Sequence, residues 1–163
     1  MAKSKGGKSL FSLSTLLASF FGSALIATAF AYFNYKFSEY KFIDFKEWVF
    51  YEKSNIFTPK EEKYVVVFYS SRDADTQNKL ANTNLNIPII AIDYYNTVRE
   101  NSDSTTFLRS GTKNSLNFIQ RFNIYESPSI FFIKKTKDTL YKQDSMIRKL
   151  DNLDALSKEV DKL

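Results

Sequence analysis

The chain has 163 residues, enough for one domain of ordinary size and a short additional segment. It contains no cysteine and no histidine, which excludes disulfides and thiolate chemistry and removes the usual general base near neutral pH. The net charge is +5, but Lys3, Lys5 and Lys8 carry three of the 23 positive charges. The remaining 20 positive charges are nearly balanced by 18 acidic residues. This balance excludes the clustered basic footprint of a nucleic-acid-binding domain.

The segment 9–35 contains no charged residue and is long enough for a helix across a hydrocarbon core, which needs about 20 residues. The basic tail 1–8 favours a cytoplasmic N-terminus. A cleaved signal peptide is the alternative, because Ala27-Thr28-Ala29 and Ala29-Phe30-Ala31 resemble cleavage sites, but the apolar region of a signal peptide runs only about 7–15 residues. We therefore expect an uncleaved single-pass signal anchor in a bacterial inner membrane, with the rest of the chain in the periplasm.

A stripe of small residues runs along this segment at spacings of three and four, namely Ser19, Gly22, Ser23 and Ala27. Such a stripe lets two helices approach closely in a membrane. Ordinary small-residue content is the simpler explanation, and contact with a partner helix is the functional alternative.

The segment 36–62 is dense in aromatic residues, some at helical spacing, such as Phe45 with Trp48. We expect a juxtamembrane helix there that ends at Thr58-Pro59. Packing on the domain is its simplest role, and a partner surface near the lipid headgroups is the alternative.

The segment 63–163 alternates apolar runs with amphipathic stretches. It predicts strands at 64–69, 87–93 and 129–134, a hairpin partner at 139–143, helices at 73–82, 112–122 and 151–163, and a loop at 97–111. The order β-α-β-α-β-β-α gives an α/β fold with a mixed sheet.

The run 121–133 reads as a helix end, a turn on Ser127-Pro128 and a buried strand. With the order of elements, it makes 63–163 resemble a thioredoxin-like domain, in which Pro128 takes the place of the family's cis-proline. The resemblance implies a cis Ser127–Pro128 bond; a trans proline at the start of a strand is the alternative.

In that family the redox cysteines lie at the start of the helix after the first strand, where this chain has Asp73 and Thr76. Neither can form a thiolate, so the resemblance carries no oxidoreductase or isomerase activity. Asp73 and Asp75 suit capping of the helix and its dipole. We expect neither a metal site nor a cofactor.

The resemblance implies instead a non-enzymatic groove that takes an extended segment of another protein, because backbone pairing beside the proline needs no cysteine. The groove residues that it implies are Tyr69, Ser70, Arg72, Asp73, Thr76, Tyr125, Ser127 and Pro128. The expected partner is a membrane or periplasmic protein, with this chain as chaperone, scaffold or subunit. Frequent Asn, Lys, Phe, Tyr and Ile suit an AT-rich bacterial genome, where an envelope machine such as a flagellar motor or secretion apparatus fits this role.

Two alternatives stay open. One is an enzyme or small-ligand carrier that uses carboxylate and hydroxyl groups around Asp73, Asp75 and Ser127. The other is a spacer, in which the folded part of the chain after the membrane helix only holds that helix in place.

Overall fold

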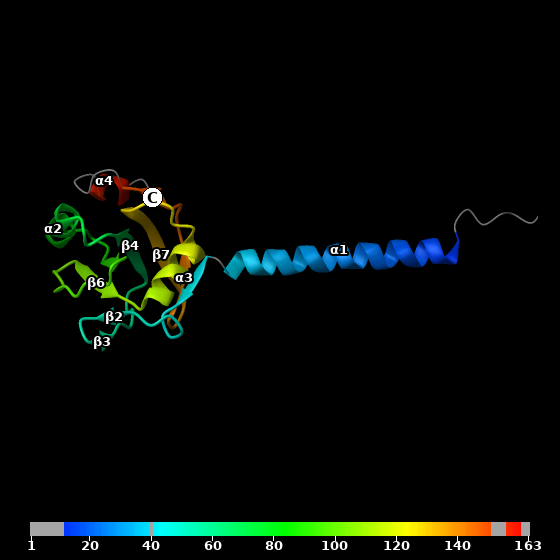
Figure 1. The fold of residues 1–163 in the computed structure, drawn as a ribbon, viewed down its shortest axis with the longest axis horizontal. Coiled ribbons are helices and arrows are strands. Elements are labelled where there is room, and N and C mark those ends of the chain that lie inside the picture. The colour runs from blue at the N-terminus through cyan, green and yellow to red at the C-terminus, as the bar shows by residue number, and fades with distance from the viewer. Residues whose placement is uncertain (1–11, 40, 151–155, 161–163) are drawn as a thin grey trace, which may run out of the picture. The chain divides into compact units, whose positions relative to one another are not determined.

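A computed structural model of the chain describes residues 12–39, 41–150 and 156–160. It divides into two compact units, 1–39 and 40–163 (Figure 1). The basic tail 1–8 lies outside the described residues, as does most of the predicted terminal helix 151–163.

The first unit is the helix α1, Leu13–Glu39. The hydroxyl oxygen of Ser12 accepts the Thr15 N–H at 3.2 Å and so caps its first turn. Further along, the hydroxyls of Ser23 and Thr28 donate to carbonyls four residues earlier, each at 2.8 Å. These two hydroxyls are thereby paired within the helix, which is compatible with an apolar environment around it. Its part Leu13–Tyr35 is long and apolar enough to cross a membrane, and none of it is buried in the protein.

The second unit is built around a mixed sheet. Its elements are β1 (Phe42–Asp44), β2 (Tyr51–Glu52), β3 (Asn55–Ile56), β4 (Lys63–Tyr69), α2 (Ala74–Asn82), β5 (Ile89–Asp93), β6 (Thr105–Arg109), α3 (Thr112–Phe122), β7 (Ser129–Lys137), β8 (Leu140–Gln143), β9 (Arg148–Lys149) and α4 (Leu156–Val160). The strand order is β1-β8-β7-β4-β5-β6-β2-β3, with β9 beside β7. Strands β4, β5 and β6 are parallel, whereas β7 is antiparallel to β4 and β8 is antiparallel to β7.

The pleat of the central strands divides the core into two layers. Val65 packs with Leu80 of α2 on one face, and Val66 packs with Phe118 of α3 on the other. In Figure 1, β4 and β7 accordingly lie between α2 and α3. Both faces of the central sheet are covered, which explains why its strands are continuous apolar runs.

The order of β4, α2, β5, α3, β7 and β8 confirms the predicted order from residue 63 onward. The Ser127–Pro128 bond is cis, as the resemblance implied. The fold is thioredoxin-like.

The prediction of a juxtamembrane helix in 36–62 is wrong beyond Glu39, where α1 ends. Strand β1 pairs with β8, and β2 and β3 form a hairpin whose first strand pairs with β6. Phe45 lies 5.7 Å from Phe57 and 5.5 Å from Tyr141, ring centre to ring centre. Packing against the sheet therefore outweighs the helical spacing of these aromatics, and the segment shares a core with 63–163.

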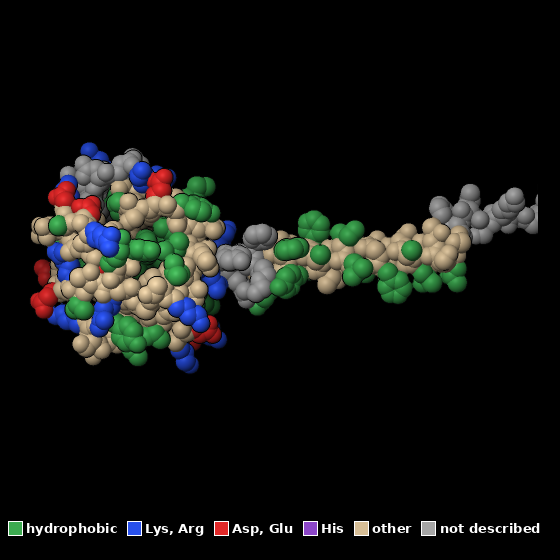
Figure 2. Space-filling view, in the orientation of Figure 1, with side chains coloured by type: hydrophobic (Ala, Val, Ile, Leu, Met, Phe, Trp, Pro, Cys, Tyr) green, Lys and Arg blue, Asp and Glu red, His purple; other side chains and the backbone are tan. Residues whose placement is uncertain are grey.

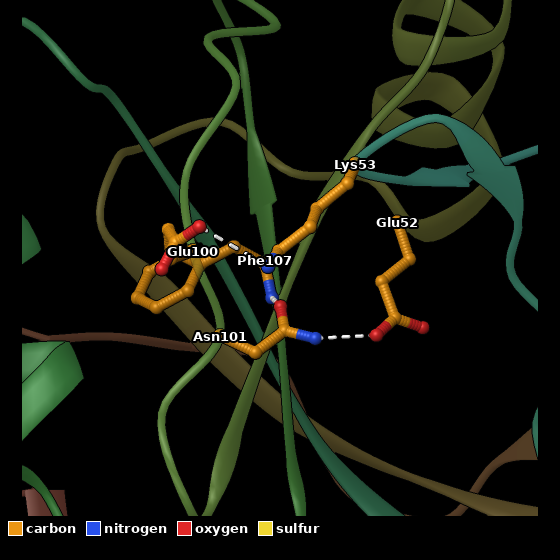
Figure 3. Close-up of polar contacts among 5 residues, drawn as sticks. All are labelled: Glu52, Lys53, Glu100, Asn101 and Phe107. Carbon is orange, nitrogen blue, oxygen red and sulfur yellow. Dashed lines mark hydrogen bonds and ion pairs between the residues drawn. The ribbon is translucent and has the colours of Figure 1, made fainter.

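The prediction of a loop over 97–111 is also wrong in part, because β6 occupies five of these residues. Figure 3 shows how polar side chains support it: the Asn101 oxygen accepts the Phe107 N–H at 2.9 Å, and its amide donates to Glu52. Beside them, Lys53 and Glu100 form an ion pair at 3.2 Å. Polar residues that suggested a loop thus attach β6 to the β2–β3 hairpin.

Candidate binding groove

An open hollow of about 290 Å³ lies where β4 and α3 end. It is lined by Phe68, Ser70, Tyr94, Tyr95, Ile119, Ile124, Tyr125, Glu126 and Ser127. Phe68 and Ser129 are opposite each other in the β4–β7 register, so two residues further on the register brings Ser70 toward Ser127. In Figure 2, hydrophobic side chains gather in the middle of the face of this unit on which α3 lies.

The wall of the hollow is aromatic. The Tyr94 ring lies edge-on to Phe68 at 6.3 Å and to Tyr95 at 5.0 Å. The Arg72 guanidinium lies 4.1 Å from the centre of the Tyr95 ring, a cation–π contact at the margin of the hollow. Tyr125 is 88% exposed, and Tyr94 and Tyr95 are each about two-fifths exposed (42% and 41%). Aromatic side chains of this kind are enriched at protein interfaces relative to the rest of the surface.

Asp93, at the end of β5, organises the loops behind this wall. Its buried carboxylate accepts the backbone N–H groups of Ser71 at 2.9 Å, Tyr95 at 3.0 Å and Thr97 at 2.7 Å. The loop after β4 and the loop after β5 are therefore held by one side chain. The sequence did not point to Asp93 as a site residue, although an acid that closes an apolar strand was visible there.

Asp73 is the N-cap of α2, as predicted. Its carboxylate accepts the Thr76 hydroxyl and the Thr76 N–H, the latter at 3.2 Å. These bonds, the hydroxyl first, hold the pKa of the Asp73 carboxyl below its usual value. Asp75 forms an ion pair with Lys79 at 3.1 Å. Both carboxylates are engaged by α2, and neither lines the hollow where Ser127 lies.

Tyr69 lies on the opposite face of the sheet from the hollow, because the pleat sends it to the side where α2 packs. It is fully buried, with its ring edge-on to Phe107 at 6.2 Å. Burial first, and the charge of Asp93 second, raise the pKa of its hydroxyl. Thr76, in the first turn of α2, is also buried.

Of the eight predicted groove residues, the structure gathers Ser70, Tyr125 and Ser127 around the hollow, with Arg72 beside it. The sequence missed the other lining residues, Phe68, Tyr94, Tyr95, Ile119, Ile124 and Glu126. The two adjacent tyrosines after an apolar strand were the one sequence pattern that could have indicated them.

The backbone beyond the proline is occupied by the chain itself. Strand β9 pairs with Ser129 and Ile130, and the Leu150 N–H donates to the Pro128 carbonyl at 2.8 Å. Ser127 is exposed, and no described residue forms a hydrogen bond with it. The backbone at Ser127 is therefore open, whereas the Glu126 carbonyl before it already accepts the Ser129 hydroxyl.

The small residues of the predicted helix-packing stripe lie on α1. Ser23 donates its hydroxyl to the Ser19 carbonyl, and the space around Gly22 is open. Contact of this stripe, which ends at Ala27, with a partner helix stays a prediction.

No protein-family model and no curated protein matches this sequence. Solved structures with a similar course of the chain include copper-bound ScoI of Arabidopsis thaliana, at 10% identity and a TM-score of 0.44, covering 62% of this chain and 83% of that chain. Another is the exposed lipoprotein thioredoxin Etrx1 of Streptococcus pneumoniae strain TIGR4, at 11% identity and a TM-score of 0.38, covering 63% of this chain and 85% of that chain. Both similarities are too distant to carry an argument about function.

Proposed function

We propose that this chain is a membrane-anchored, non-catalytic binding module whose hollow takes an extended segment of another membrane or envelope protein. The observation that carries the proposal is the exposed aromatic wall beside Ser127. Three tyrosines, Tyr94, Tyr95 and Tyr125, stay exposed around one hollow in a unit that otherwise buries most of its large rings. Aromatic anchors of this kind supply much of the binding energy at protein interfaces.

The polar groups at the rim suit an extended peptide. Ser127 presents a backbone that no described residue engages, so a bound segment can pair with it as a short added strand. Glu126 lies beside it and forms an ion pair with Lys149 at 3.3 Å, which keeps its charge balanced. The occupant therefore has an apolar or aromatic side chain for the hollow and free backbone groups for the rim.

The same proposal places α1 across a bacterial inner membrane, with the N-terminus in the cytoplasm and residues 40–163 in the periplasm. The apolar length of α1 and the basic tail 1–8 support it. At this location the chain acts as a chaperone, scaffold or subunit of an envelope complex, such as a motility or secretion machine.

No catalytic role is part of the proposal. The chain lacks cysteine and histidine, and the local bonds of Asp73 and Asp75 separate them from the exposed Ser127. Among the described residues, no group of three or more acidic side chains could hold a metal ion.

Variants of the hollow test this proposal. Tyr125→Ala and Tyr95→Ala, each in the full-length protein in native membranes, should lower the amount of a specific co-purified partner at least tenfold, because truncated aromatic anchors cost about 2 kcal/mol or more. Tyr51→Ala, at a tyrosine on β2 that is 37% exposed, is the matched control and should retain the partner. Equal recovery of the partner with all three variants would contradict the proposal.

A larger side chain at the rim separates the groove from the spacer alternative. Ser127→Trp leaves the anchor and the core intact but obstructs the hollow. The binding module loses its partner and its cellular function with this variant, whereas a spacer keeps both.

A further inference from the structure

Three lysines and one phenylalanine stand in a row across four neighbouring strands. Lys63 is opposite Lys134 in the β4–β7 register, Lys134 is opposite Lys142 in the β7–β8 register, and Lys142 is opposite Phe42 in the β1–β8 register. Directly opposed residues of antiparallel strands point to the same face, with Cβ atoms about 5 Å apart. We call these four residues the lysine row.

The row gathers like charges where a sheet would ordinarily avoid them, because like charges directly opposite each other are destabilising. Among the residues that the structure describes, Lys63 is the one lysine of the row with an acidic partner, Asp144 at 3.2 Å, and its ammonium also lies 4.2 Å from the centre of the Phe132 ring. Lys142 lies 5.7 Å from the ring centre of Phe42. Lys134 is exposed and forms no ion pair with a described residue. The repulsion is therefore only partly offset within the protein.

Another carboxylate on this face, that of Asp44, is already engaged. Asp44 follows Phe42 by two residues on β1, and it accepts the Thr139 hydroxyl at 2.7 Å and the Lys46 N–H at 2.9 Å. The row thus presents an excess of positive charge with an aromatic ring at one end. Basic and aromatic side chains together are typical of protein surfaces at the headgroup level of a membrane.

A short stretch of chain joins the end of the row at Phe42 to α1. Three residue steps separate Glu39, the last residue of α1, from Phe42, and three steps extend at most about 11 Å. Strand β1, the edge strand whose Phe42 is opposite Lys142, is therefore connected to the predicted membrane helix by no more than this length of chain.

We propose that the lysine row binds anionic phospholipid headgroups of the membrane that α1 spans. This inference rests on the membrane anchoring in the proposed function and goes beyond the groove. Phe132, which packs with Leu80 of α2, lies below the Lys63 ammonium, so the row is on the α2 face of the sheet, whereas the hollow is on the α3 face. Lipid bound at the row leaves the hollow open to a protein partner.

Quenching by headgroup-labelled lipid tests the inference with the full-length chain in nanodiscs. The chain has no cysteine, so Thr136→Cys, at an exposed position of β7 two residues beyond Lys134, accepts a single fluorophore. Asn117→Cys, exposed on α3, is the control site on the opposite face. The nanodiscs contain phosphatidylcholine and a fixed small fraction of lipid with a nitroxide on its headgroup, with or without phosphatidylglycerol.

Phosphatidylglycerol should increase quenching at position 136 but not at position 117, and about 1 M salt, where the Debye length is about 3 Å, should reverse the increase. The double variant Lys134→Gln with Lys142→Gln should lower the population ratio of the lipid-bound to the lipid-free state of residues 40–163 at least tenfold. Each lysine near an anionic leaflet multiplies this ratio by about five. Lys113→Gln with Lys158→Gln removes the same charge from exposed positions on α3 and α4 and should change little.

Quenching that does not depend on phosphatidylglycerol, or that falls equally with both double variants, overturns the inference while the groove proposal stands. Failure of the chain to insert into nanodiscs overturns this inference and the anchoring together. Thermal unfolding of each variant confirms that the sheet is intact.

Discussion

The carboxylate of Asp93 accepts the backbone N–H of Ser71 at 2.9 Å, although 22 positions separate the two residues in the sequence. This bond joins the end of β5 to the loop after β4. With the bonds to Tyr95 and Thr97, it fixes the two loops that carry Ser70 and the tyrosine pair. A buried acid therefore shapes the hollow without lining it.

Loss of this carboxylate should loosen the hollow. Asp93→Ala removes a buried carboxylate and leaves the N–H groups of Ser71, Tyr95 and Thr97 without this acceptor, so we expect a loss of about 2–4 kcal/mol in the free energy of unfolding and faster amide exchange in both loops. Urea unfolding and hydrogen exchange measure this. Asp103→Asn, at an exposed acid in the loop before β6, should stay within about 0.5 kcal/mol of the wild type, and an equal effect of both variants would refute the role of Asp93.

The cap of α2 should contribute a pH-dependent part of the stability. Asp73→Ala should lower the free energy of unfolding by about 1 kcal/mol at neutral pH. Because the folded pKa of Asp73 is lowered, its contribution is complete above the unfolded pKa of about 3.9 and is lost as the pH falls through the folded value. Urea unfolding between neutral and acidic pH should therefore show the two proteins converge, whereas Asp75→Ala, at an exposed ion pair, should have a smaller effect.

Two buried tyrosines should make the fold sensitive to alkali. Burial is the first cause of the raised pKa of both Tyr69 and Tyr141, and the Tyr141 hydroxyl donates to the Glu61 carbonyl at 2.6 Å. The folded state keeps the two hydroxyl protons more strongly than the unfolded state does. Their contribution to the free energy of unfolding is therefore complete below the unfolded pKa of about 10 and is lost as the pH rises above it. In an alkaline titration followed by tyrosinate absorbance, a fraction of the tyrosines should ionise at higher pH than the exposed ones, together with unfolding. Tyr141→Phe should reduce that fraction, and an unchanged fraction would contradict the assignment.

The N-terminal helix should remain in the mature protein. Intact mass spectrometry of the protein from membranes should find the chain near 18.9 kDa, and alkaline washing should not release it. A mature N-terminus at Phe30 or Tyr32 would instead show cleavage after the small-residue sites.

The elements best predicted from the sequence are those whose pattern reflects burial on both faces or on one stripe. The runs at 64–69 and 89–92 hold only residues suited to a covered parallel sheet, and 112–122 has apolar residues at helical spacing, so their types were evident, although β5 begins at Ile89, beyond Pro88, and not at 87. The short strands of 42–56 escaped prediction because two or three residues show no period, and their pairing partners, β8 and β6, lie far along the chain.

The site was predictable in place but not in detail. The resemblance located Ser70 and Ser127 at one end of the sheet, which the register between β4 and β7 supports. It also assigned Tyr69 to the groove, because the sequence does not say which face of the pleat each residue of a fully buried strand takes. The roles of Tyr94, Tyr95 and Asp93 depend on how two loops meet, so the local pattern of an acid and two tyrosines after an apolar strand was visible but did not show where these side chains lie.

The central claim is that the hollow binds another protein, and site-specific photo-crosslinking in intact cells tests it most directly. A photoreactive residue in place of Tyr125, which is 88% exposed at the hollow, should capture one defined partner, and the Ser127→Trp substitution should abolish the capture. The same residue in place of Tyr51 on β2 is the control and should not capture that partner. Equal capture from both positions, or capture from position 125 that persists with Ser127→Trp, would contradict the account.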